Sequence, residues 1–189
     1  MRVIAGKFRS RPLRSLPGMD LRPTADRLRE TLFNVLGAGN PTVFDGKVWL
    51  DLCAGTGAVG IEALSRGAAM VYFVESSTAA ASLIQRNLDA LAVDAAFEVV
   101  KQDVTRALRN LEAKNVIAHF IFLDPPYRLE KVFAQVLQLL AQSHLVAPDA
   151  VVVAEHDKRF DPGDGFSPLL RFRRLEQGDA VLSFYRLVR

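Results

Sequence analysis

The chain has a single cysteine, Cys53, among its 189 residues. One cysteine excludes an internal disulfide, and the three histidines (His119, His144 and His156) are scattered without metal-ligand spacing. No stretch approaches the roughly 18 apolar residues of a membrane-spanning helix, and the basic start lacks the apolar run of a secretory signal. We therefore expect a cytoplasmic protein with no metal site and no membrane partner.

The first 16 residues contain no Asp or Glu, although they carry five cations. The whole chain has a formal charge of +3, so the other residues sum to −2. The cations are Arg2, Lys7, Arg9, Arg11 and Arg14, and they alternate with Val3, Ile4, Phe8 and Leu13. This interleaving predicts a basic arm or hairpin over residues 1–20 that contacts a phosphate backbone, and a solvated tail is the alternative.

The rest of the chain, residues 21–189, has the size of one α/β domain. An apolar face predicts a helix over 25–36 with Thr24 as its N-cap. The predicted strands are 47–53, 70–75, 97–100, 120–124 and 150–155, and the helices between them are 58–66, 78–91, a short one from 104 and 129–142. This alternation implies a parallel sheet with helices on both faces. Residues 170–176 and 180–188 predict a final hairpin, so the sheet should end with an antiparallel strand.

A glycine loop, Asp51-Leu-Cys-Ala-Gly-Thr-Gly-Ala-Val-Gly60, follows the first predicted strand and opens a helix. Glycines let the backbone approach a ligand closely, and the helix N-terminus offers free N–H groups. The spacing of Gly55, Gly57 and Gly60 also matches the dinucleotide fingerprint, so NAD is an alternative ligand. Asp51 favours S-adenosylmethionine, because an acid attracts the α-amino group of that cofactor and would repel a pyrophosphate.

Two further acids follow predicted strands. Glu75 ends the second strand, where it can accept hydrogen bonds from a ribose diol; in the alternative reading Asp51 caps a strand and Glu75 is an exposed strand end. Asp103 follows the third strand and fits either an adenine amino group or the N-cap of the next helix, and these two roles are compatible. The expected cofactor-binding residues are Asp51, Ala54, Gly55, Gly57, Glu75 and Asp103.

The segment Asp124-Pro125-Pro126-Tyr127 ends the fourth predicted strand. Two prolines stiffen the chain and fix Asp124 and the Pro125 carbonyl as two acceptors at the sheet edge. Acceptors for both N–H groups of an exocyclic amine would aim its lone pair at a sulfonium methyl, and Asp124 can take the proton. Tyr127 offers a face for stacking a flipped or unpaired base. A proline-stiffened loop with a chance Asp and Tyr is the alternative.

With both motifs in place, the chain resembles class I, Rossmann-like methyltransferases that act on amines. It is most similar to the bacterial family that methylates guanine N2 in 16S ribosomal RNA. The resemblance is carried by Met1-Arg-Val-Ile-Ala-Gly-Lys7, by Leu21-Arg-Pro-Thr-Ala-Asp-Arg-Leu-Arg-Glu-Thr-Leu-Phe-Asn34 and by Glu62-Ala-Leu-Ser-Arg-Gly-Ala68. Cys53, Thr56 and Tyr127 depart from the family's usual aromatic residue, serine and phenylalanine, and all three changes are conservative.

The resemblance implies a seven-stranded, mostly parallel sheet with an antiparallel C-terminal strand and a basic N-terminal extension that contacts RNA. The implied cofactor is S-adenosylmethionine and the implied partner is small-subunit ribosomal RNA or an assembling small subunit. It assigns base handling to residues 124–127 and places Arg22, Thr24 and Arg27 near the substrate, with helix capping and surface charge as their alternative roles. We expect a monomer.

Other functions remain open at this stage. The Asp-Pro-Pro-aromatic segment also occurs in enzymes that methylate adenine N6 or protein glutamine, but the chain leaves no room for a separate DNA-recognition domain, and a glutamine substrate would not explain the basic arm. A non-catalytic RNA-binding module would need no Asp124. An NAD oxidoreductase would need a hydride-transfer partner, and none is obvious.

Overall fold

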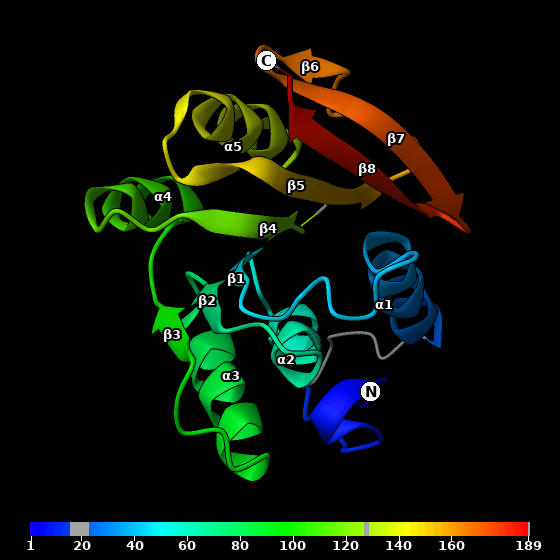
Figure 1. Cartoon of the computed structure of the whole chain (residues 1–189), viewed down its shortest axis with the longest axis vertical. Coiled ribbons are helices and arrows are strands. Elements are labelled where there is room, and N and C mark those ends of the chain that lie inside the picture. Colours follow the sequence, from blue (N-terminus) through cyan, green and yellow to red (C-terminus); the bar gives the residue numbers. More distant parts are fainter. Residues whose placement is uncertain (16–22, 127–128, 189) are drawn as a thin grey trace.

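The alternating segments of the chain form one eight-stranded sheet in the computed structural model (Figure 1). The structure describes residues 1–15, 23–126 and 129–188, without the side chains of residues 23–25. The strands are β1 (Val48–Leu52), β2 (Met70–Val74), β3 (Phe97–Val100), β4 (Ala118–Leu123), β5 (Val146–Asp157), β6 (Gly165–Phe166), β7 (Leu169–Gln177) and β8 (Ala180–Leu187). The helices are α1 (Pro23–Leu36), α2 (Ala58–Ser65), α3 (Thr78–Ala90), α4 (Val104–Ala113) and α5 (Glu130–Gln142), with a 3₁₀ turn η1 (Gly6–Phe8). Their order in the sheet is β3-β2-β1-β4-β5-β8-β7-β6.

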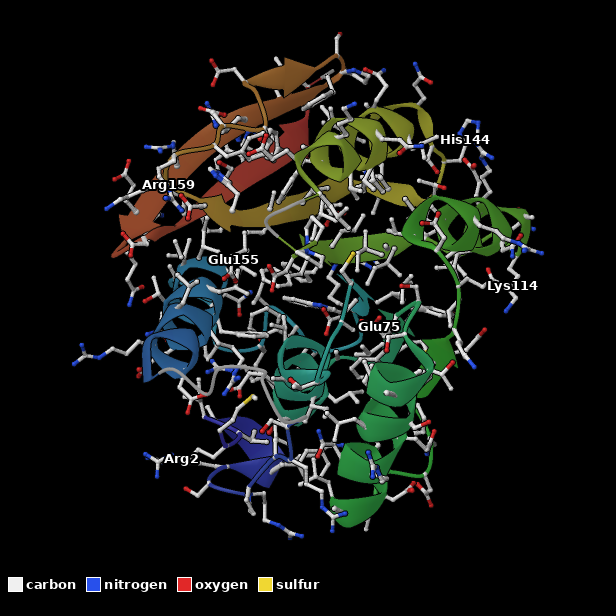
Figure 2. All side chains as sticks on the ribbon, turned by 180° about the vertical axis from the view of Figure 1, so that it is seen from behind. Arg2, Glu75, Lys114, His144, Glu155 and Arg159 are labelled. Atoms are coloured by element: carbon white, nitrogen blue, oxygen red, sulfur yellow. The ribbon has the colours of Figure 1, made fainter. Side chains whose placement is uncertain are left out.

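Residues 1–15 fold back on themselves. The Val3 N–H donates to the Arg11 carbonyl and the Ser10 N–H donates to the Val3 carbonyl, both over 2.9 Å. The side chains of Val3 and Leu13 are buried in the body of the protein, whereas the Arg2 side chain extends into solvent (Figure 2). The apolar residues of the basic segment therefore anchor it, and its cations remain on the surface.

Helix α2 holds this arm through one buried acid. The N–H groups of Ile4 and Ala5 donate to the two carboxylate oxygens of Glu62 over 2.7 and 2.9 Å, and Glu62 is fully buried. Gly6 has φ +79°, and a Cβ there would lie 1.8 Å from the Ser65 carbonyl oxygen. Only glycine fits this close approach between the arm and the helix.

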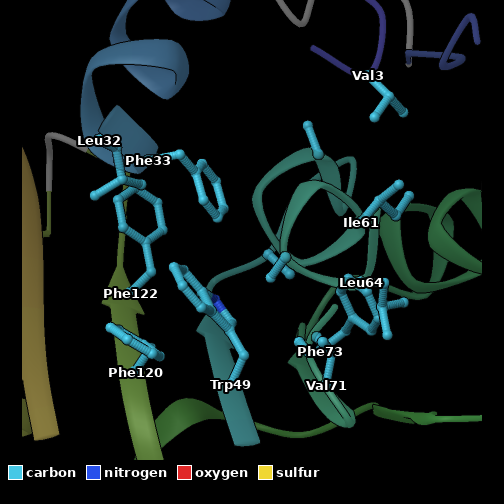
Figure 3. Close-up of a cluster of buried hydrophobic side chains, with 14 of the residues drawn as sticks. Val3, Leu32, Phe33, Trp49, Ile61, Leu64, Val71, Phe73, Phe120 and Phe122 are labelled. Atoms are coloured by element: carbon cyan, nitrogen blue, oxygen red, sulfur yellow. The ribbon is translucent and has the colours of Figure 1, made fainter. Parts of the chain in front are cut away.

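The parallel half of the sheet is buried on both faces. β1 pairs with β2 on one side and β4 on the other, and β3 and β5 continue the parallel pairing outward. Along β1, Trp49 packs in the core shared with α1, α2 and α3, whereas Leu50 packs in the core shared with α4 and α5. In the first core the Trp49 ring stacks on Phe33 and Phe120 with centroids 5.1 and 5.3 Å apart (Figure 3). Strands covered on both faces need nearly continuous apolar sequence, which these have.

The predicted elements are confirmed, with three differences. The sheet has eight strands, not the expected seven, because β6 is a two-residue strand that is too short to give a periodic pattern. β5 begins at Val146, four residues early, because a register shift in its pairing with β4 accommodates Pro148. α1 begins at Pro23, so Thr24 lies in its first turn and is not its N-cap. Proline fits a first helical position, since its missing N–H would have no partner there.

The end of the sheet is antiparallel, as predicted. β8 runs antiparallel to both β5 and β7, and the β7–β8 connection is the expected tight turn at Gly178. Within the described ranges, no helix is both long and apolar enough to cross a membrane.

Candidate active site

Acidic side chains lie near or directly after the ends of four neighbouring strands, at the edge where the parallel strands end. Asp51 lies in β1, Glu75 directly follows β2, Asp124 directly follows β4, and Glu155 lies near the end of β5. Figure 2 labels Glu75 and Glu155, which lie between the helices of the two faces. Ligands of open α/β sheets bind outside the carboxyl ends of the strands, so this edge is the first candidate for a binding site.

A large cavity of about 590 Å³ opens at this edge. Its size falls in the range of small-molecule and cofactor sites. The structure here brings together six predicted site residues from separate parts of the chain. The lining includes Gly55, Glu75, Asp103, Asp124, Pro125 and Pro126, with Ser76, Ser77, Leu129 and Val132 between them.

A small cavity of about 150 Å³ adjoins the large one. Asp51 and Ala54 of the glycine loop line it, together with apolar side chains from α1, β4 and β8, which are Leu28, Leu32, Phe122 and Leu182. Met1 of the arm also lines it. Cys53, Asp124 and Glu155 line both cavities, so these three residues mark the boundary across which a group could pass from one ligand to another.

Asp51 links the glycine loop to the helix that follows it. Its Oδ2 accepts a hydrogen bond from the Gly60 N–H over 2.8 Å, and the residue is only 2% exposed. Burial raises the pKa of this carboxyl to about 8, and the charges of Asp124 and Glu75 add to the shift. The side chain thus has a structural bond as well as a place in the small cavity. Gly57 lines neither cavity; it precedes α2 in a left-handed conformation with φ +76°.

Glu75 forms a hydrogen bond to the backbone of the glycine loop. Its Oε2 accepts from the Gly55 N–H over 2.9 Å, and its Oε1 accepts from the Ser77 N–H over 2.8 Å. A carboxylate oxygen has two lone-pair directions. Each oxygen can therefore accept a further hydrogen bond from a ligand hydroxyl in the large cavity.

Asp103 is the N-cap of α4. Its Oδ1 accepts from the Thr105 N–H and hydroxyl over 2.9 and 2.6 Å and from the Arg106 N–H over 3.4 Å. The bonds from Thr105 lower the pKa of the Asp103 carboxyl. The capping role is thus observed, and because these bonds all involve Oδ1, Oδ2 is left for a ligand in the large cavity.

Asp124 continues the pairing of β4 with β1, since its N–H donates to the Leu52 carbonyl over 3.2 Å. Burial raises the pKa of its carboxyl to about 7. Pro125 is buried and Pro126 is exposed, and the Pro126 carbonyl accepts from the Leu129 N–H over 2.8 Å. Tyr127 lies outside the described residues.

The predicted RNA-binding residues fall into two groups. The exposed ones are Arg2, Lys7, Arg9, Arg11 and Arg14 of the arm and Arg27 of α1. Of these, Arg11 has a local partner, because its Nη2 donates to the Ala90 carbonyl over 2.9 Å. Arg22 and the side chain of Thr24 lie outside the described residues.

Nearly the whole chain, residues 1–186, matches one family model, described as conserved hypothetical protein 95. The chain belongs to this family. The YlbH protein of Bacillus subtilis is 35% identical over 98% of this chain and 98% of its own length. Ribosomal RNA small subunit methyltransferase D of Escherichia coli (strain K12) is 36% identical over 83% of this chain and 75% of its own. The solved structure of yhhF from Escherichia coli has a TM-score of 0.80 at 31% identity, covering 99% of this chain and 97% of that one.

In this member of the family, the sequence prediction missed two residues that line the small cavity. Glu155 lies near the end of β5, and an acid closing a fifth apolar strand was a signal of the same kind as Asp51 and Glu75. Arg29 of α1 is 5% exposed, pairs with Asp26 over 3.0 Å and lies 3.8 Å from Glu62. Arg29 lies within the Leu21–Asn34 motif, but helical periodicity alone does not show that a cation faces inward.

Proposed function

We propose that this chain is an S-adenosylmethionine-dependent methyltransferase that methylates the exocyclic N2 amine of a guanine in small-subunit ribosomal RNA. The observation that carries the proposal is the pair of adjoining cavities with Asp124 on their shared boundary. Relatives of the same family in Escherichia coli and Haemophilus influenzae are named ribosomal RNA small subunit methyltransferase D, each at 36% identity. Both the name and the geometry support a reaction between a cofactor and an RNA base.

The residues of the large cavity fit S-adenosylmethionine. Glu75 offers acceptors for a ribose diol and Asp103 offers Oδ2 for an adenine amino group. Asp51, on the adjoining small cavity, would bind the α-amino group. When bound there, the cofactor would supply a methyl group on a positively charged sulfur. An acidic rather than phosphate-binding cradle agrees with a ligand that carries positive charge.

The residues of the boundary fit an amine acceptor. An exocyclic amine is a weak nucleophile because its lone pair is delocalised into the ring. Asp124 and the Pro125 carbonyl would accept hydrogen bonds from its two N–H groups, and these bonds would localise the lone pair toward the methyl donor. As the N–C bond forms and the S–C bond breaks, Asp124 would take the proton that the amine loses. A base could enter the small cavity, whose walls are largely apolar, only if it were flipped out of a helix or already unpaired.

The cofactor assignment predicts the effect of losing Glu75. Glu75→Ala is expected to weaken S-adenosylmethionine binding by about 1–3 kcal/mol, because charge-assisted hydrogen bonds to the ribose are lost. Isothermal titration calorimetry measures the change in affinity. The control is Asp89→Ala, which removes an exposed acid from α3. Wild-type affinity in Glu75→Ala would place the ribose elsewhere.

The exposed cations of the arm predict a salt-dependent RNA interaction. Deleting the arm would open the core, since Val3 and Leu13 are buried, so the test is Lys7→Gln with Arg9→Gln. Losing two phosphate contacts should lower the slope of log affinity against log salt by about 1–2 units. Filter binding over a salt series measures the slope. The control is Arg106→Gln with Arg109→Gln on the exposed side of α4, and an equal slope in both variants would contradict an RNA role for the arm.

The function itself is tested by offering labelled S-adenosylmethionine with unmodified small ribosomal subunits, naked ribosomal RNA, DNA and ribosomal protein in parallel. N2-methylguanosine recovered from the subunit or its RNA is the expected result. Label recovered in DNA or protein would show that the enzyme methylates a different amine. Binding of NAD in place of S-adenosylmethionine, or no binding of either, would support an oxidoreductase or a non-catalytic RNA-binding module respectively.

A further inference from the structure

Glu155 has no role in the reaction described so far, yet it lies beside Asp124. β4 and β5 are parallel, and Leu123 pairs with Ala154, so Asp124 and Glu155 are the next two positions on neighbouring strands. Both residues line both cavities. Within the described part of the chain, the Glu155 side chain forms no hydrogen bond and no ion pair. A partly buried carboxyl group at the boundary of two cavities is therefore available to a ligand.

The surroundings of Glu155 favour the neutral carboxylic acid. Burial raises the pKa of its carboxyl well above the ordinary value, and the nearby charge of Asp124 raises it further. Arg29 also lines the small cavity, but its guanidinium is paired with Asp26 and lies near Glu62. A neutral carboxylic acid presents a donor, its O–H, next to an acceptor, its carbonyl oxygen.

Guanine presents the complementary pattern next to its reactive amine. Along one edge of the base lie the N2 amine, the N1–H donor and the O6 acceptor. If the amine meets Asp124, N1–H and O6 continue along the same edge and meet the next side chain. Adenine placed with its amine at Asp124 continues with the N1 acceptor and then C2–H, so a carboxylic acid at Glu155 could form one hydrogen bond with it, whereas guanine allows two. The neighbouring strands β4 and β5 thus offer two carboxyl groups to one edge of guanine.

We propose that Glu155 is the specificity-determining residue, which recognises N1–H and O6 of the guanine whose N2 amine Asp124 engages. The inference rests on the proposed function and adds to it the group that selects guanine. Glu155→Gln keeps both an acceptor and a donor, so it should keep the selection. Glu155→Leu removes both at similar volume and should lose it.

The test compares two RNAs that differ at the methylated position once that position is mapped. One carries guanosine, and the other carries 2-aminopurine riboside, which retains the N2 amine but lacks N1–H and O6. Wild type should prefer guanosine by about 10- to 100-fold in kcat/KM, the discrimination expected of a bidentate contact. The ratio of kcat/KM on the guanosine RNA to that on the 2-aminopurine RNA should stay near the wild-type value in Glu155→Gln. In Glu155→Leu the ratio should fall close to one, because activity is lost on the guanosine RNA alone. Calorimetry with S-adenosylmethionine and thermal unfolding verify that both variants are folded and bind cofactor as wild type does.

The outcomes separate the two proposals. If the wild type methylates no guanine in any RNA, the proposed function fails and this inference fails with it. If the wild type methylates guanine and Glu155→Leu still prefers guanosine, or loses activity on both RNAs equally, only the role of Glu155 is overturned. Loss of selection in Glu155→Leu with its retention in Glu155→Gln supports the inference.

Discussion

Asp124→Ala is expected to lower the rate of methyl transfer by about 10²- to 10⁴-fold, the contribution typical of a positioned acid–base group, while S-adenosylmethionine affinity stays near wild type. The reason is the location of Asp124 on the boundary of the two cavities. In the proposed reaction it would face the acceptor amine there, whereas Glu75 and Asp103 would supply separate cofactor contacts. Single-turnover transfer of labelled methyl measures the first quantity, and isothermal titration calorimetry measures the second.

The control for Asp124→Ala is Asp94→Ala, which removes an exposed acid from the loop between α3 and β3. It should change neither quantity. Retained turnover in Asp124→Ala would refute the acceptor role. Loss of cofactor binding together with turnover would also contradict it, because Asp124 would then belong to the cofactor subsite.

The repeated strand–helix unit made much of this fold predictable. Buried strands such as β1 and β4 are short runs of apolar residues, and turn residues and helical periodicity separate them, so sequence gives their positions within one or two residues. β6 and the start of β5 depend on pairing with distant strands. A two-residue strand has no periodicity, and Pro148 argues locally against a strand that the irregular β4–β5 register tolerates.

The candidate site was predictable for a related reason. In a parallel sheet all carboxyl ends meet at one edge, so Asp51, Glu75 and Asp124 had to converge once the alternation was recognised. What sequence could not show is the division of that edge into two adjoining cavities. Part of the wall of the small cavity comes from α1 and from Met1 of the arm, and these segments reach it through tertiary contacts that leave no local signal.

The attachment of the arm is the clearest case of such a contact. Glu62 lies 57 and 58 residues from its backbone donors, Ala5 and Ile4. Its carboxylate also pairs with Arg66 over 2.8 Å and lies 3.8 Å from Arg29. In the sequence Glu62 belongs to a motif with no evident role, and a helical acid is most often exposed. The structure makes it the buried centre that joins the arm, α1 and α2.

Glu62→Ala should therefore destabilise the protein strongly. The substitution leaves two backbone N–H groups without acceptors and leaves Arg29, whose side chain is 4% exposed, without a nearby acid other than Asp26. Breaking a buried ion pair by removing one partner costs about 3–5 kcal/mol, and urea unfolding would measure that loss. Glu98→Ala removes an acid from the exposed pair with Lys114 and should cost under about 1 kcal/mol. If both variants lost a similar, small amount, Glu62 would not be what holds the arm, and the packing of Val3 and Leu13 would suffice to dock it beside the small cavity.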